Sequence, residues 1–185
     1  RIPPLSGVSR PRLAAARRPC PMAADAAAAA AKAEGRVLLP DVALPSRYEI
    51  RLEPDLERFT FDGTVAITLD VREATDELML HAKELSVTSV ALTAAADGAT
   101  EMSPSVITYN LKDNTVKFVF DEVLPVGPGC LKMKYIGELN NQMAGFYRSS
   151  YNDINGNKKM MASTQFESLD ARRCFPCWDE PARKA

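Results

Sequence analysis

An alternation of apolar and polar residues with a period of two dominates the chain from Leu44 onward. It is clearest between Phe59 and Val71, where apolar side chains take nearly every odd position and polar or small ones stand between them. Successive side chains of a β-strand point to opposite faces of the sheet, so this pattern predicts a strand with one buried face. The same alternation is present just upstream, from Tyr48 to Leu52.

Further strands are predicted at short intervals along the rest of the chain. They cover residues 77–81, 86–92, 106–110, 115–120, 130–136, 145–151 and 159–166. Turn-forming residues separate them, at Asp97-Gly98, Lys112–Asn114, Pro125–Gly129 and Asn155-Gly156. No segment after residue 40 predicts a helix. Many short strands joined by turns are typical of an all-β fold, so we predict an antiparallel β-sandwich or saddle of two sheets over residues 40–185.

Residues 1–39 are predicted to be a disordered segment in front of this fold. The alanine run from Ala26 to Ala31 favours a helix, but it is short and has no apolar stripe with which to dock. Two explanations stay open for residues 1–21, which are rich in arginine, alanine and proline. They resemble an organellar transit peptide, or they are translated upstream sequence with Met22 as the natural start. We favour the second, because small residues follow Met22.

The charge distribution argues against several classes of partner. Five of the 23 basic residues lie in residues 1–21, which hold no acid, so the remaining 18 face 24 acidic residues. A mildly acidic domain is not expected to bind nucleic acid. No apolar run approaches the roughly 20 residues of a membrane span. Four cysteines are too few for a disulfide-stapled secreted domain, so we expect a cytoplasmic protein. An organellar location and peripheral membrane association stay open as alternatives.

No catalytic residue or metal ligand can be assigned within the chain. His81 is the only histidine, and it lies in a predicted strand, where a structural hydrogen bond is its expected role. A catalytic zinc site normally uses two or three histidines, and the H-E-x-x-H helix is missing. The chain also lacks a P-loop, a G-x-S-x-G elbow and a dinucleotide fingerprint. Whether the chain is an enzyme therefore stays uncertain from its residues alone.

Cys174 and Cys177 form a C-x-x-C pair with two interpretations. Such a pair can run disulfide exchange, or it can supply half of a zinc knuckle. Redox pairs normally begin a helix in a βαβ unit, whereas strands precede this one. A zinc knuckle would need Cys20 and Cys130, whose spacing is poor. We therefore favour buried structural thiols.

Gln165 and Glu167 are the predicted substrate-binding residues. Residues i and i+2 of a strand point to the same face, so both side chains would project into one cleft. A carboxylate beside an amide is suited to binding and orienting an ammonium group. The neighbouring charges are expected to form ion pairs that fasten an irregular segment: Asp170, Arg172, Arg173, Asp179 and Glu180.

Several longer motifs occur in one order along residues 38–185. They are Leu44–Leu56, Phe59–Val65, Gly137–Asn140, Gly145–Tyr151 and the run from Thr164 through Pro181. With these motifs the chain resembles the N-terminal domain of zinc aminopeptidases of the puromycin-sensitive, plant and aminopeptidase N types. The resemblance implies a saddle-shaped β domain whose concave side caps a thermolysin-like catalytic domain. It also implies that Glu167 binds the free α-amine of a peptide and that Gln165 lines the pocket for its first side chain.

The resemblance implies a zinc aminopeptidase that releases N-terminal residues, with peptides as substrates and its own catalytic domain as partner. Zinc is then a cofactor of the full-length enzyme and is not bound by this chain, because the exopeptidase and zinc-binding motifs would follow Ala185. We therefore expect the 185-residue chain to be inactive by itself. The alternative is a stand-alone β-sandwich module that binds peptides or a partner without catalysis.

Overall fold

The computed structural model describes residues 38–94 and 101–185, and nearly all of its regular structure is β. The strands are β1 (Ala43–Asp55), β2 (Thr60–Val71), β3 (Thr75–His81), β4 (Leu85–Ala94), β5 (Glu101–Met102), β6 (Val106–Asn110), β7 (Thr115–Leu124), β8 (Gly127–Glu138), β9 (Gly145–Asn152) and β10 (Lys158–Gln165). Two short 3₁₀ helices follow, η1 (Ala171–Arg173) and η2 (Pro181–Arg183). Within the described ranges there is no α-helix, and hence no helix with the length and hydropathy to cross a membrane.

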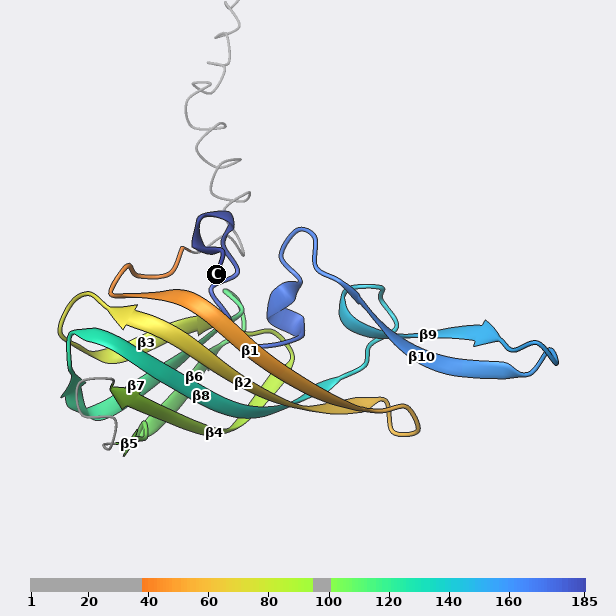
Figure 1. Cartoon of the computed structure of the whole chain (residues 1–185), viewed down its shortest axis with the longest axis horizontal. Coiled ribbons are helices and arrows are strands. Elements are labelled where there is room, and N and C mark those ends of the chain that lie inside the picture. Colours follow the sequence, from red (N-terminus) through yellow and green to blue (C-terminus); the bar gives the residue numbers. More distant parts are fainter. Residues whose placement is uncertain (1–37, 95–100) are drawn as a thin grey trace, which may run out of the picture. The chain divides into compact units, whose positions relative to one another are not determined.

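The strands form three antiparallel sheets (Figure 1). The largest has five strands in the order β1-β2-β8-β4-β5, and a second has three in the order β3-β7-β6. The hairpin of β9 and β10 forms a separate two-stranded sheet. Strands distant in sequence lie next to each other, as in the pairing of β2 with β8 over their full length.

One continuous core joins the five-stranded and three-stranded sheets. The alternation in β2 buries one face of the strand, from Phe61 to Val71, and the opposite face is exposed. Leu80 on β3 and Phe118 on β7 are fully buried and belong to the same apolar cluster as Ile67 on β2. This arrangement confirms the predicted all-β sandwich, since each sheet contributes one apolar face to a shared interior. The two-stranded sheet was not predicted as a separate element.

Reciprocal glycine and aromatic pairs lie in the core where β2 begins and β8 ends. Tyr135 on β8 lies opposite Gly63 on β2, and Phe61 on β2 lies opposite Gly137 on β8. A methyl group added to either glycine would overlap the facing aromatic ring. The two rings contact each other edge to face, with centroids 6.4 Å apart. Each bulky ring therefore lies over the space left by a glycine on the neighbouring strand.

The turn predictions have different outcomes. The turn at residues 112–114 is confirmed, with Asn114 at a positive φ of 54°. At Pro125–Gly129 the turn is shorter than predicted, because β8 already begins at Gly127. The hairpin turn at Asn155-Gly156 is confirmed, but it is part of a five-residue connection in which only Gly156 has a positive φ. The predicted turn at Asp97-Gly98 lies outside the described residues.

Most of the predicted disordered segment, residues 1–37 of 1–39, also lies outside the described residues. The last position of that segment, Leu39, is described, and it is buried against the core. Its backbone N–H donates to Glu180 Oε1 at 2.6 Å, so the segment that leads into β1 contacts the residues that follow β10.

Candidate functional site

Residues 166–185, which we call the terminal run, lie beyond the last strand and contact the end of β3. The backbone N–H of His81 donates to Cys177 O at 2.9 Å, and the N–H of Cys177 donates back to His81 O at 3.0 Å. The Lys83 N–H donates to the carbonyl oxygen of Arg172 at 2.8 Å. These bonds attach the irregular terminal run to the C-terminal end of β3, which is an edge strand of its sheet.

His81 has the structural role predicted for it. Its side chain is 1% exposed, and its Nδ1 accepts a hydrogen bond from the Asp179 N–H at 3.2 Å. This geometry requires an unprotonated Nδ1. The residue therefore orders the backbone of the terminal run from inside the protein.

A largely buried ion pair joins two residues of the terminal run, Arg172 and Asp179. Arg172 Nε donates to Asp179 Oδ2 at 2.8 Å, and the two side chains are 3% and 14% exposed. The guanidinium also donates through Nη2 to Asp179 O at 3.3 Å. Two further pairs join the same run, Arg173 with Asp170 and Arg173 with Glu84. The prediction that these charged residues form ion pairs that hold the irregular segment in place is confirmed.

A hollow of about 700 Å³ opens between the terminal run and β1. We call it the terminal hollow; Tyr48 and Ile50 line it from β1, and residues between Glu167 and Ala185 line the rest. Its aromatic residues are fixed by their own contacts. The Tyr48 hydroxyl accepts a hydrogen bond from the Trp178 N–H at 3.1 Å, and the Tyr48 and Phe175 rings meet edge to face at 5.8 Å. Burial raises the pKa of Tyr48 well above its usual value, so this hydroxyl stays neutral.

The two predicted site residues occupy different positions. Glu167 lines the terminal hollow, whereas Gln165 is exposed at the end of β10 and is not among the lining residues. The argument that strand periodicity puts both side chains on one face does not hold, because Glu167 lies beyond β10 in a turn. The reason is that Gln165 pairs with Gly145, the first residue of β9, so the strand has no partner beyond it.

The carboxylates around the terminal hollow differ in the hydrogen bonds and ion pairs that they make. Asp179 binds Arg172, and Glu180 accepts the Leu39 N–H and lies 3.8 Å from Arg183. Glu167, in contrast, is exposed and has no hydrogen bond or ion pair with any described residue. An unengaged carboxylate beside aromatic walls is suited to binding an ammonium group, through charge and through the faces of the rings.

Sequence reasoning missed the residues that complete this hollow. Tyr48 was recognised only as part of a strand pattern, and it lies 130 residues before Trp178, whose backbone it binds. No local pattern connects the two. The signal that could have been used is the single tryptophan itself, because a large side chain in an irregular segment needs a packing surface from elsewhere.

The described residues offer no metal site. Within residues 38–94 and 101–185, no group of three or more histidine, cysteine, aspartate or glutamate side chains could hold a metal ion. These side chains therefore do not fit a zinc centre, and we assign no ligand to zinc in this part of the chain.

Cys174 and Cys177 are buried, at 1% and 3% exposed, which confirms the structural interpretation. Burial raises the pKa of Cys174 to about 12. Burial, together with the nearby Asp179 carboxylate, raises the pKa of Cys177 well above its usual value. Because the thiolate is the reactive form, both cysteines are poor nucleophiles, and nothing in this geometry favours a redox role.

We predict that both thiols resist alkylation while the chain is folded. With the pKa raised, the thiol stays protonated at pH 8, and its reactive fraction grows only as the pH rises toward 12. Iodoacetamide at pH 8 is expected to label Cys174 and Cys177 at least about 100-fold more slowly in the native protein than in urea. Peptide mass spectrometry measures the rates, and the partly exposed Cys130 is the internal comparison. Native rates at Cys174 or Cys177 equal to those in urea would contradict the burial argument.

The comparisons with known proteins point in one direction. The family model described as Peptidase M1 N-terminal domain matches residues 44–185. Aminopeptidase M1 of Arabidopsis thaliana is 49% identical over 154 residues, which is 82% of this chain and 17% of that protein. Aminopeptidase M1-A of Oryza sativa subsp. japonica is 48% identical over 152 residues, with the same two shares. Puromycin-sensitive aminopeptidase of Caenorhabditis elegans is 44% identical over 148 residues, or 80% of this chain and 15% of that protein. The chain thus spans about a sixth of the length of these relatives.

Proposed function

Because the chain belongs to the family of Peptidase M1 N-terminal domains, we propose that it is the substrate-side domain of a zinc aminopeptidase. In this role it binds the free N-terminus of a peptide and orients it for cleavage of the first peptide bond. The zinc ion and the residues that activate water are then supplied by a catalytic domain outside residues 1–185. The isolated chain is expected not to hydrolyse peptides, and the cytoplasmic location stays a prediction.

One observation supports this proposal most strongly: Glu167 borders a hollow of about 700 Å³ and has no partner among the described residues. A carboxylate that is not neutralised by its own protein is available to a protonated amine, and such charge-assisted hydrogen bonds are the stronger ones. Fixing the amine would place the first peptide bond at a constant distance from the reaction centre, which turns binding energy into orientation. Gln165, two residues earlier, is proposed to contact the first side chain.

The single tryptophan provides a direct test of binding. Trp178 lines the terminal hollow and is the only tryptophan of the chain, so its fluorescence reports on this place. We expect the tripeptide Leu-Gly-Gly, with a free α-amine, to change the Trp178 emission in a saturable way. Its N-acetylated form is the matched control, because it keeps every heavy atom of the tripeptide but carries no positive charge.

The two peptides separate the proposal from its alternatives. A response to the free amine that the acetylated peptide does not produce is expected from the proposed role of Glu167. Equal responses to both peptides would contradict amine recognition and would favour a general peptide-binding module. Loss of the free-amine response in the Glu167→Gln variant then assigns it to this carboxylate.

A further inference from the structure

The exposed face of the five-stranded sheet carries two lysines at its centre. Lys132 and Lys134 lie on β8, which is bonded to β2 on one side and to β4 on the other. Both side chains are exposed, and they alternate with Leu131, Met133 and Tyr135, which are buried in the core. The two ammonium groups therefore project from the face that the sandwich leaves open to solvent.

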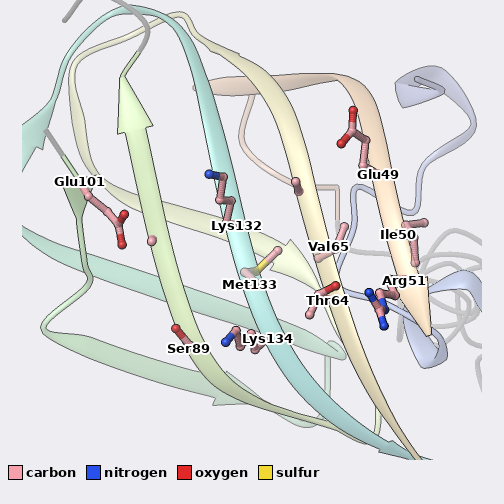
Figure 2. Close-up of a pocket in the computed structure, with 12 residues that line it drawn as sticks. Glu49, Ile50, Arg51, Thr64, Val65, Ser89, Glu101, Lys132, Met133 and Lys134 are labelled. Carbon is pink, nitrogen blue, oxygen red and sulfur yellow. The ribbon is translucent and has the colours of Figure 1, made fainter. Parts of the chain in front are cut away.

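Hydroxyl groups flank Lys134 on both neighbouring strands. Its partner on β2 is Thr64, and its partner on β4 is Ser89. Figure 2 shows the Lys134 side chain extending from β8 toward Ser89. An ammonium group and two hydroxyls thus occur in one row across the sheet, and each can donate a hydrogen bond to the same acceptor.

Alanines flank Lys132 in the corresponding way. Its partner on β2 is Ala66, and its partner on β4 is Ala91. Because these side chains are small, the sheet surface is hollowed here. One pocket of about 570 Å³ is lined by both rows, that is, by Lys134 with its two hydroxyl neighbours and by Lys132 with its two alanine neighbours (Figure 2). We call it the sheet hollow. Its volume is within the range of pockets that bind small ligands.

Among the described residues the two lysines have no ionic partner, whereas the arginines at the edge of the same face do. Neither Lys132 nor Lys134 makes a hydrogen bond or an ion pair through its side chain with any described residue. On β1, Arg47 pairs with Glu49 at 2.9 Å and Arg51 pairs with Glu53 at 2.9 Å. The positive charge of this face is therefore concentrated along β8, between acids at its borders.

We propose that the sheet hollow binds an extended peptide segment with acidic side chains at alternate positions. Lys132 and Lys134 are two positions apart on one strand, and alternate residues of an extended ligand have the same spacing of roughly 6.6 Å. One carboxylate of the peptide contacts Lys134 and the hydroxyls of the two flanking residues, Thr64 and Ser89. The next carboxylate contacts Lys132, above the two flanking alanines. Glu101 and the Arg47-paired Glu49 line the borders, and this arrangement disfavours the continuous backbone charge of a nucleic acid more than a ligand that has charges only at alternate residues. The ligand is therefore a peptide with spaced acids.

The test uses the 185-residue chain and a labelled probe peptide, acetyl-Val-Glu-Val-Glu-Val-Glu-amide, with fluorescence anisotropy as the readout. We expect saturable binding that weakens as salt is raised from 20 to 200 mM, because both partners are charged and exposed. The Lys132→Glu/Lys134→Glu variant is expected to bind at least about tenfold more weakly. The matched control is Lys158→Glu/Lys159→Glu, which makes the same charge change on exposed lysines of β10 and is expected to bind within about twofold of the unchanged chain.

A second variant tests the hollow without changing any charge. Ala91→Leu fills the floor beside Lys132, and we expect it to weaken binding of the probe by about tenfold or more. No saturable binding by the unchanged chain, or equal losses in the two lysine double variants, would overturn the proposal. Displacement of the probe by mixed-sequence duplex DNA as readily as by unlabelled peptide would overturn it as well, since it would show a general affinity for polyanions.

Discussion

Replacement of Arg172 by alanine is expected to lower the free energy of unfolding by about 3–5 kcal/mol, because it leaves a largely buried carboxylate without its partner. Asp179 is 14% exposed and accepts the Arg172 Nε–H at 2.8 Å. The arginine also donates to Asp179 O, and its own carbonyl accepts the Lys83 N–H. The variant therefore loosens the terminal run itself, whose backbone bonds to His81 and Lys83 remain, and urea denaturation followed by circular dichroism measures the decrease in stability.

The double variant Arg172→Met/Asp179→Leu is the control for this prediction. Removing both charges leaves no unpaired ion in the interior, so we expect it to be more stable than Arg172→Ala and close to the unchanged chain. The pair of measurements distinguishes an electrostatic cause from the removal of packing by the long arginine side chain. A decrease below about 1 kcal/mol in the single variant would show that water reaches Asp179 and that the pair is effectively a surface one.

The Glu167→Ala change, made in an aminopeptidase that contains this domain, is expected to lower kcat/KM by about 30- to 1,000-fold. That range corresponds to the roughly 2–4 kcal/mol that a charge-assisted hydrogen bond contributes in a partly desolvated site. The reason is that Glu167 is the carboxylate of the terminal hollow that no described residue neutralises. Hydrolysis of leucine 4-nitroanilide over a range of substrate concentrations measures the effect.

Two control variants, Glu167→Gln and Glu138→Ala, test whether the loss of activity comes from the charge of Glu167. Glu167→Gln keeps the size and the acceptor oxygen but removes the charge, so we expect it to lie between the alanine variant and the unchanged enzyme. Glu138→Ala removes an exposed carboxylate of β8 that is not part of the terminal hollow, and its kcat/KM should stay within about twofold. If Glu167→Ala leaves both KM and kcat unchanged, this carboxylate does not hold the amine.

The strands were predictable because alternation is a local property. Each predicted strand after residue 40 corresponds to a strand of the structure, and the clearest of them, from Phe59 to Val71, became β2. Which strands pair is not a local property. β2 lies between β1, its neighbour in sequence, and β8, which begins more than 50 residues later. Nothing in the alternation distinguishes that partner from any other strand with one apolar face.

The candidate site could be predicted only in part, and the limit has a physical origin. The chemistry of Glu167 was evident from its type and its motif, but its geometry depends on where β10 stops. β10 stops at Gln165 because β9 begins at Gly145, so the position of one strand end is decided by the other strand of the hairpin. The two lysines of β8 were not recognised at all, since their importance depends on Thr64, Ser89 and the two alanines beside them.

The glycine and aromatic pairs of β2 and β8 have a consequence for how this domain can change over evolutionary time. Gly63 has room for a side chain only if Tyr135 becomes smaller, and Gly137 has room only if Phe61 becomes smaller and Leu85 shifts. A substitution at one member of a pair is thus disfavoured until the other has changed, and each pair passes through a destabilised intermediate. Among related domains, positions 63 and 135 should covary, and so should positions 61 and 137. Each pair of positions, one on β2 and one on β8, would then change together or not at all.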